Sequence, residues 1–247
     1  MSVYKFSHYD KNIKIPFCPM DTKKLWRDNQ RSFPNDKTTQ YYLKNPIEYQ
    51  FNNYGFRTPD DFNNIDYGNV FLGCSHTIGI GHHLENTWSF KVNQTIGGKF
   101  WNLSQGGSGT DTAFRLLYGF KDLLTFKNVF HFAPTMHKYR YEFIIDSQPR
   151  LMNISYDNGK HAKRFLSDMF VEQSLVDEDV AQINYDKSIH SIKSLVDEIG
   201  GNYYLLDEKV MDFNDKNSIK ARDFTHYTID QQEHLYQSFL KIISKKT

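Results

Sequence analysis

Short apolar runs that alternate with helical segments are the feature that most constrains the fold of this chain. Such runs occupy residues 69–73, 100–103, 128–133 and 203–206. Each run has the length of a strand that is buried on both faces. The alternation therefore predicts a parallel sheet with helices on both of its faces, an α/β fold in three layers.

Helices are expected between and after these runs. The first is predicted to start near Gly79 and to continue through Phe90, and the second has Thr110 and Asp111 as N-cap candidates. Residues 160–199 are expected to be mainly helical because their apolar residues recur at helical spacing. A further helical segment is expected at the end of the chain.

The first fifty residues follow a different pattern. They are polar and aromatic, contain scattered prolines and show no sustained period. We interpret residues 1–50 as an N-terminal extension that wraps the domain or contacts a partner, and two short strand-like pieces fit within it. Residues 51–247 are then expected to form the domain.

Charge and hydropathy exclude several classes of protein. The chain carries 30 basic and 29 acidic residues, a net charge of +1, so nothing marks it as a nucleic-acid-binding protein. Residues 1–6 lack the apolar core of a signal peptide, and no stretch approaches the roughly 20 apolar residues of a membrane span. We expect a cytoplasmic or assembly-associated protein without nucleic-acid or membrane partners, and the sequence leaves its oligomeric state open.

Cysteines and neighbouring histidines give no metal pattern. Cys18 and Cys74 match neither a disulfide framework nor a zinc site, and Cys74 is expected to be a small core residue. His76, His82 and His83 lie close in sequence but have no matching cysteine or carboxylate spacing. We predict no metal and no cofactor, and His82 and His83 are expected either as structural residues or at the mouth of a cleft.

Ser75 lies in a tight Gly-x-Ser turn between the first apolar run and the helix after it. Such a turn exposes the hydroxyl and directs backbone N–H groups to the same space. Serine becomes a nucleophile when a base removes its proton, and that base is usually a histidine oriented by an acidic group. Asp223 and His226 lie three residues apart in one turn and provide both groups.

A glycine-rich loop at 106–109 follows the second run, and residues 134–137 follow the third. Because ligands bind outside the carboxyl ends of the strands in such sheets, these segments and Ser75 are expected to gather at one edge. The amides of Ser75 and Gly107 are candidate donors to an oxyanion, since a glycine lets substrate approach the backbone closely.

Each of these elements also has an ordinary structural interpretation. A Gly-x-Ser turn is common, an Asp-x-x-His segment is often a helix cap with a surface histidine, and a glycine-rich loop is often only a turn or a phosphate-binding loop. The order and placement of the three elements together favour catalysis.

Three segments resemble the sequence blocks of the SGNH (GDSL-like) hydrolases, a superfamily of esterases and acyltransferases. Residues 53–57 and 70–81 resemble the first block, in the variant that reads Gly-Cys-Ser instead of Gly-Asp-Ser. Residues 102–111 are similar to the second block, with Gly107 at its oxyanion glycine, and 223–226 matches the last block, Asp-x-x-His. The resemblance implies a flavodoxin-like three-layer α/β/α fold and hydrolysis or transfer of an acyl group, often on acetylated sugars.

The third block of that superfamily, Gly-x-Asn-Asp, has no counterpart here. Its place after the third run reads Phe-Ala-Pro-Thr-Met-His, without the asparagine that donates to the oxyanion. Either Thr135 or His137 replaces it, or the site has one donor fewer. Loss of such a donor costs roughly 10²–10³ in turnover.

Other polar residues near these segments have two interpretations each. Arg57 is expected to pair with an acidic residue, or else to contact an anionic substrate. Tyr139, Arg140 and Tyr141 follow the third run and either line a sugar pocket or pack in the interior.

The sequence therefore predicts a serine esterase of the SGNH type. It would hydrolyse or transfer an acyl group, such as acetyl, from a carbohydrate or a small ester. Ser75, Asp223 and His226 are the predicted catalytic residues, and Gly107 with Thr135 or His137 would contact the oxyanion or substrate. The alternative is a binding or structural protein of the same fold with little or no activity, as part of a viral or other assembly.

Overall fold

A computed structural model of the protein describes residues 3–145, 148–153, 177–207 and 218–245. Its centre is a four-stranded parallel sheet in the order β4-β3-β5-β8. The strands are β3 (Tyr67–Leu72), β4 (Lys99–Asn102), β5 (Thr125–Phe132) and β8 (Asn202–Leu206). All four predicted strands are confirmed, and their order along the sheet is that of a flavodoxin-like fold.

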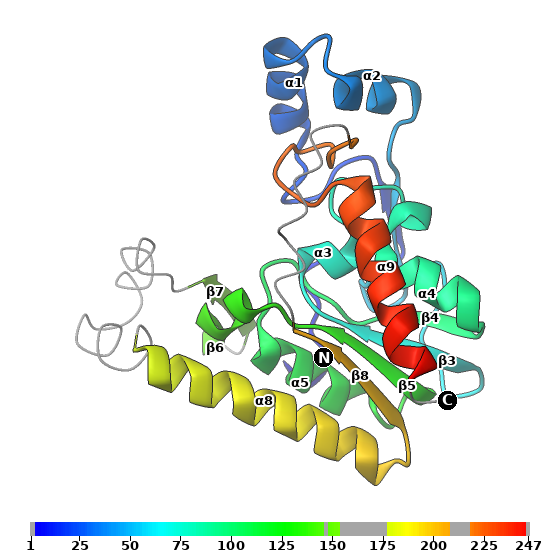
Figure 1. Ribbon diagram of the computed structural model, residues 1–247, viewed down its shortest axis with the longest axis vertical. Helices are drawn as coiled ribbons and strands as arrows, with labels where there is room; N and C mark the ends of the chain where they lie inside the picture. The colour runs from blue at the N-terminus through cyan, green and yellow to red at the C-terminus, as the bar shows by residue number, and fades with distance from the viewer. Residues whose placement is uncertain (1–2, 146–147, 154–176, 208–217, 246–247) are drawn as a thin grey trace.

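Helices cover both faces of the sheet, which confirms the three-layer α/β/α architecture (Figure 1). α5 (Thr110–Phe120) and α8 (Glu178–Glu198) pack on one face, and α4 (Trp88–Ile96) and α9 (Ile229–Ser244) on the other. Successive residues of β3 point to opposite faces, so Val70 and Leu72 contact the first layer and Phe71 the second. The central residues of the strands are mostly apolar because both faces of the sheet are buried there.

The helix predicted from Gly79 through Phe90 is wrong. α3 (Ser75–Ile78) begins earlier and ends after one turn, at Gly79 in the left-handed conformation (φ 77°). A Cβ on Gly79 would overlap the side chain of Thr87, so this close approach requires glycine. A 3₁₀ turn, η2 (Leu84–Asn86), follows, and Thr87 then caps α4 by accepting the Phe90 amide hydrogen.

The expected N-caps of α5 are also wrong by one or two residues. Gly109 occupies the N-cap position, and Asp111 lies inside the first turn. There its carboxylate accepts the amide hydrogens of Thr112 (2.7 Å) and Glu142 (2.5 Å). The helix predicted within 160–199 is confirmed from Glu178 onward, and 160–176 lies outside the described residues.

The N-terminal fifty residues contain more regular structure than their pattern indicated. A 3₁₀ turn, η1 (Val3–Lys5), comes first, and β1 (Ile13–Ile15) pairs antiparallel with β2 (Tyr49–Phe51). Between these strands lie two helices that were not predicted, α1 (Lys23–Ser32) and α2 (Lys37–Lys44). In Figure 1 they form the end of the molecule farthest from α8.

This N-terminal region shares a hydrophobic core with the segment around α3. The core contains Trp26, Tyr42 and Tyr49 together with Ile78 and Ile80. The boundary at residue 50 therefore stays a prediction, because side chains from both of its sides pack together. Cys74 lies fully buried, as expected, and both cysteines are free.

A β-hairpin follows the third strand of the sheet. After β5 the chain forms a 3₁₀ turn, η3 (Thr135–Tyr139), and then β6 (Arg140–Ile145) and β7 (Gln148–Asn153), which pair antiparallel.

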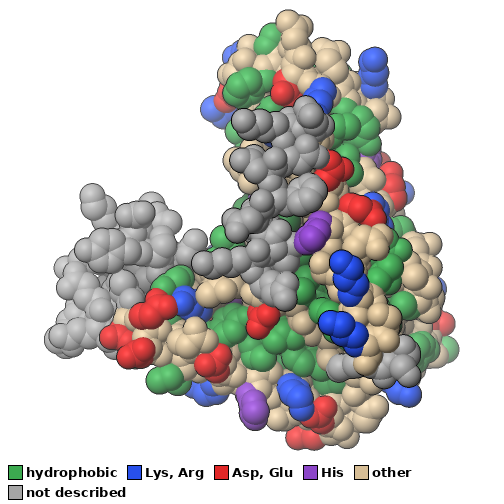
Figure 2. Space-filling view, viewed as in Figure 1, with side chains coloured by type: hydrophobic (Ala, Val, Ile, Leu, Met, Phe, Trp, Pro, Cys, Tyr) green, Lys and Arg blue, Asp and Glu red, His purple; other side chains and the backbone are tan. Residues whose placement is uncertain are grey.

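Basic and acidic side chains both occur over the face of the molecule shown in Figure 2. None of the helices in the described ranges is long and apolar enough to cross a bilayer.

Candidate active site

Ser75 is the first residue of α3 and follows a turn that only glycine can make. Gly73 has φ 145°, and a Cβ there would overlap Thr77 Oγ1 and approach the Phe132 carbonyl oxygen at 2.9 Å. Cys74 is the N-cap of α3, and Ser75 is buried with 3% of its surface exposed. The Gly-x-Ser spacing thus fixes where the hydroxyl lies.

The position of Ser75 coincides with the point where the sheet reverses its strand order. From β3 the chain continues to β4 on one side of it and then to β5 on the other. Parallel sheets leave a crevice at the carboxyl ends of the two strands at such a point. Ser75 follows β3 and the 134–137 segment follows β5, so both lie at this edge of the sheet.

The glycine-rich loop is bonded to the Ser75 turn. The carbonyl oxygen of Gly73 accepts hydrogen bonds from Ser108 Oγ (2.8 Å) and from the Gln105 amide (3.3 Å). Gly107 lies between these residues with φ 77°, and no described atom lies within 4 Å of the position its Cβ would take. The structure therefore brings Gly107 beside Ser75, with open space next to its backbone.

Asp223 and His226 form a bonded pair. His226 Nδ1 bonds to Asp223 Oδ2, and Asp223 Oδ1 accepts the amide hydrogens of Thr225 and His226, both at 3.1 Å. Burial would raise the pKa of Asp223, but the hydrogen bonds and charge of His226 and the bonds of Thr225 outweigh it and lower the pKa below 3.8. The carboxylate is ionised at neutral pH, and it leaves His226 Nε2 as the nitrogen that can accept a proton.

The loop that carries this pair lies against α3. The rings of His226 and His76 pack edge to face with centroids 5.2 Å apart, and Tyr227 stacks on His76 at 3.4 Å. His76 directly follows Ser75, so the predicted base and nucleophile lie in the same region. The described side chains of Ser75 and His226 do not hydrogen-bond to each other; in unliganded enzymes such bonds are often long.

The two predicted donors after β5 differ in burial. Thr135 is exposed, whereas His137 is 1% exposed and neither ring nitrogen has a hydrogen-bond partner among the described residues. Burial and the nearby charge of Arg140 hold the pKa of His137 well below 6.5. The ring is therefore neutral, with one N–H donor and one acceptor.

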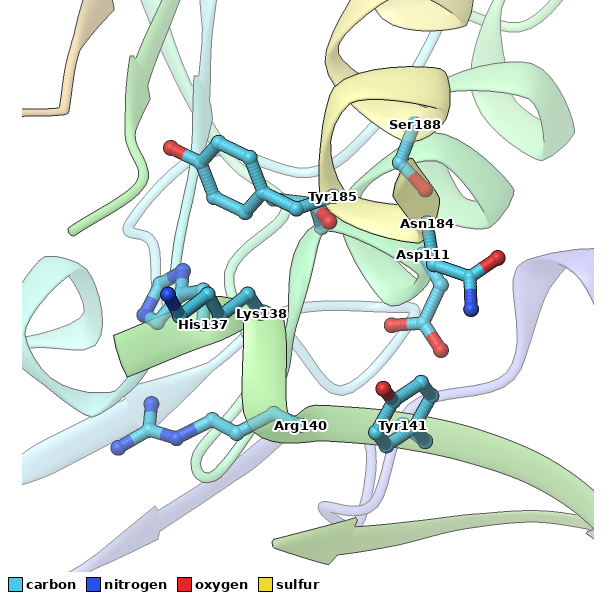
Figure 3. A pocket seen from close by; sticks show the side chains of 9 residues that line it. Asp111, His137, Lys138, Arg140, Tyr141, Asn184, Tyr185 and Ser188 are labelled. Carbon is cyan, nitrogen blue, oxygen red and sulfur yellow. The ribbon is translucent and has the colours of Figure 1, made fainter. Parts of the chain in front are cut away.

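His137 also borders a small cavity of about 20 Å³, enough for one water molecule (Figure 3). The cavity is lined by Thr110, Asp111, His137, Lys138, Arg140, Tyr141, Asn184, Tyr185 and Ser188. Tyr139 is not among these residues, and its hydroxyl bonds to Glu178. In Figure 3 the Arg140 side chain extends on the His137 side, away from Asp111 and Tyr141.

The acidic partner expected for Arg57 is wrong, whereas for His82 the structural alternative is the one that the structure shows. Arg57 pairs with no acidic residue in the described structure and instead donates to three backbone carbonyls, those of Ile78, Gly79 and His82, which holds the turn after α3. His82 does not lie at the mouth of a cleft. It is fully buried, with its ring bonded to the Tyr227 carbonyl and the Tyr42 hydroxyl.

A buried ion pair behind the site was missed by the sequence pattern. Arg222, next to Asp223, donates to the carboxylate of Asp21, with Nη2–Oδ2 2.6 Å and Nε–Oδ2 2.9 Å. Its Nη2 also donates to the Pro16 carbonyl, and Asn29 donates to the Arg222 carbonyl. Sequence alone gives no sign of this pairing, because its members are about two hundred residues apart.

Within the described ranges, no three His, Cys, Asp or Glu side chains are grouped so that they would hold a metal ion.

No protein-family model matches the sequence. No curated protein matches it either.

Two solved structures are similar to this chain in their arrangement of helices and strands. One is a carbohydrate esterase whose active site is described as displaying divergent catalytic and non-catalytic binding functions. It has 9% identity and a TM-score of 0.35 over 72% of this chain and 68% of that chain. The other is a member of the lipolytic protein G-D-S-L family from Veillonella parvula DSM 2008, with 11% identity and a TM-score of 0.38 over 72% of this chain and 99% of that chain.

Proposed function

We propose that this protein is a serine hydrolase of the SGNH type that acts on ester bonds. The observation that carries the proposal is the bonded Asp223–His226 pair, which lies against the short helix that begins with Ser75. A nucleophile, a base and an acid that orients the base are the parts that acyl transfer requires.

The mechanism follows from the roles of these side chains. As the Ser75 hydroxyl attacks the ester carbonyl, His226 Nε2 accepts its proton, and the charge of Asp223 stabilises the imidazolium. The amides of Ser75 and Gly107 donate to the oxyanion of the tetrahedral intermediate. His226 then returns the proton to the departing alcohol. A water molecule completes hydrolysis of the acyl-enzyme, or a sugar hydroxyl completes transfer.

Of the two candidates for the third donor, His137 fits better than Thr135. Its imidazole is buried and neutral, and its N–H has no described partner to compete with a substrate. Thr135 is exposed to solvent, where water competes for its hydroxyl. The substrate class we propose is an acyl ester, such as an acetyl ester, of a carbohydrate or a small alcohol.

A fluorophosphonate probe tests this proposal because it labels only activated serines. The wild type should be labelled and Ser75→Ala should not, although its circular dichroism and melting temperature stay unchanged. Ser191→Ala is the matched control, since this half-buried serine lies on α8 and its hydroxyl donates to the Lys187 carbonyl of the same helix.

Labelling that persists in Ser75→Ala would contradict the assignment of the nucleophile. A folded wild-type protein that is not labelled would favour the alternative, a binding or structural protein of the same fold.

A further inference from the structure

Arg140 differs from the other arginines that are withdrawn from solvent. Arg57 donates to three backbone carbonyls, and Arg115 and Arg222 each make several hydrogen bonds with a carboxylate. Half-buried Arg140 makes one long hydrogen bond to an oxygen, 3.4 Å from Nη1 to the Ser108 carbonyl, and one weak bond to the sulfur of Met136, and it pairs with no described carboxylate. Most of its five N–H donors are left for another group.

The guanidinium of Arg140 lies on the Gly107 side of the Ser75 turn. Ser108, which accepts its hydrogen bond, directly follows Gly107 and donates through Oγ to the Gly73 carbonyl. The second contact of Arg140 is with the sulfur of Met136, 3.5 Å from Nη2. These two contacts hold the cation between the glycine-rich loop and the segment after β5, at the edge of the sheet where Ser75 lies.

Among the residues that the structure describes, no carboxylate is bonded to this cation. The nearby histidines, His76 and His137, are neutral. Both rings are buried, and desolvation, with Arg140 as a further cause, holds the pKa of each well below 6.5. The carboxylates nearby in the described structure already have partners. Asp111 accepts backbone amides, Glu142 is bonded to Arg115, and Asp223 is bonded to His226.

A half-buried guanidinium without a counter-ion favours an incoming anion, because a carboxylate or phosphate replaces the water it has lost with charge-assisted hydrogen bonds. The unpaired N–H of buried His137, on the same segment, is assigned above to the reacting oxyanion, so the charge of Arg140 is left for a second, anionic group of the substrate. We propose that Arg140 binds such a group, a carboxylate or a phosphate. The preferred esters then carry negative charge near the scissile bond.

The part of this inference that concerns ester cleavage rests on the proposed function. Anion binding does not depend on it, so binding is tested first. In Ser75→Ala protein, calorimetric titration should show binding of monomethyl succinate, of methyl phosphate, or of both, and no binding of the neutral dimethyl succinate. Which anion binds distinguishes a carboxylate from a phosphate ligand. Adding Arg140→Gln should weaken binding about tenfold or more, while Arg150→Gln, an exposed arginine on the same hairpin, should not.

Equal binding of the charged and neutral esters, equal binding with and without Arg140, or no binding of either anion to folded protein would overturn the inference. Hydrolysis gives the second readout. The wild type should favour mono-4-nitrophenyl succinate over 4-nitrophenyl acetate in kcat/KM, and Arg140→Gln should lower kcat/KM for the charged ester about tenfold more than for the neutral one. An equal loss on both esters would also overturn it. If neither ester is hydrolysed by wild type, the proposed function fails and the titration alone decides anion binding.

Discussion

Arg222 and Asp21 form an ion pair that is almost completely buried, with 3% of the guanidinium side chain and none of the carboxylate side chain exposed. Asp21 also accepts a hydrogen bond from the Tyr49 hydroxyl at 2.5 Å. Arg222 directly precedes Asp223, so the N-terminal region holds the loop that carries the proposed acid and base. Phe33 of the same region stacks on Phe224, a residue with φ 62°, at 5.2 Å.

Asp21→Asn is expected to lower both stability and activity. Removing one charge leaves the Arg222 guanidinium buried without a counter-ion, which costs about 3–5 kcal/mol. Urea denaturation and the rate of fluorophosphonate labelling measure the two effects. Asp28→Asn is the control, since this carboxylate lies on the surface of α1 and pairs only with exposed Lys24. Unchanged unfolding of Asp21→Asn would contradict a structural role for the buried pair.

His226→Ala and Asp223→Asn are expected to lower kcat by roughly 10³–10⁴ on an activated ester such as 4-nitrophenyl acetate. The first change removes the base, and the second removes the charge that orients it. His190→Ala on the exposed surface of α8 should retain wild-type turnover. If His226→Ala keeps most of its activity while remaining folded, another group acts as base.

Gly73→Ala and Gly107→Ala are expected to separate folding from catalysis. A methyl group at Gly73 overlaps Thr77, so that variant should be strongly destabilised. At Gly107 no described atom obstructs the methyl group. The left-handed backbone there costs an alanine roughly 1–2 kcal/mol of stability. Gly107→Ala should therefore fold but be labelled more slowly by the probe. Equal melting temperatures for the two variants would contradict this difference.

Stability is expected to fall as the pH drops below about 6.5. Burial lowers the pKa of His82 to about 4 and of His131 to about 3, so below 6.5 the unfolded chain binds protons that the folded chain does not. Each such histidine contributes a slope of at most about 1.4 kcal/mol per pH unit, from 6.5 down to its folded pKa. Asp111, whose pKa burial raises to about 6, opposes this trend between 3.8 and 6.

Urea denaturation at pH 7.0, 5.5 and 4.5 measures this dependence. His131→Gln cannot titrate and should show a shallower decline than the wild type. A stability that stays constant over this range would contradict neutral burial of these histidines.

The sheet and the border of the site were predictable because they follow from local patterns. A strand buried on both faces must be apolar throughout, and residues that follow parallel strands must meet at one edge. That the Ser75 turn and the glycine-rich loop lie together was predicted in this way, and the Asp-x-x-His spacing alone predicted that Asp223 and His226 share one turn.

The remaining features depend on contacts between distant residues. The end of α3 at Gly79 is imposed by the side chain of Thr87, which a helical pattern does not reveal. The carbonyl partners of Arg57 exist only after the turn beyond α3 has formed. That Arg140 has no carboxylate partner among the described residues is likewise visible only in the folded structure.

The 201-residue separation of Asp21 and Arg222 has a consequence for biosynthesis. Chains fold from the N-terminus as they leave the ribosome, so Asp21 emerges long before its counter-ion has been translated. Until residue 222 is available, closure of the N-terminal core would bury an uncompensated carboxylate. The N-terminal core thus reaches its final packing only after residue 222 has left the ribosome, and the proposed nucleophile and base come together only then.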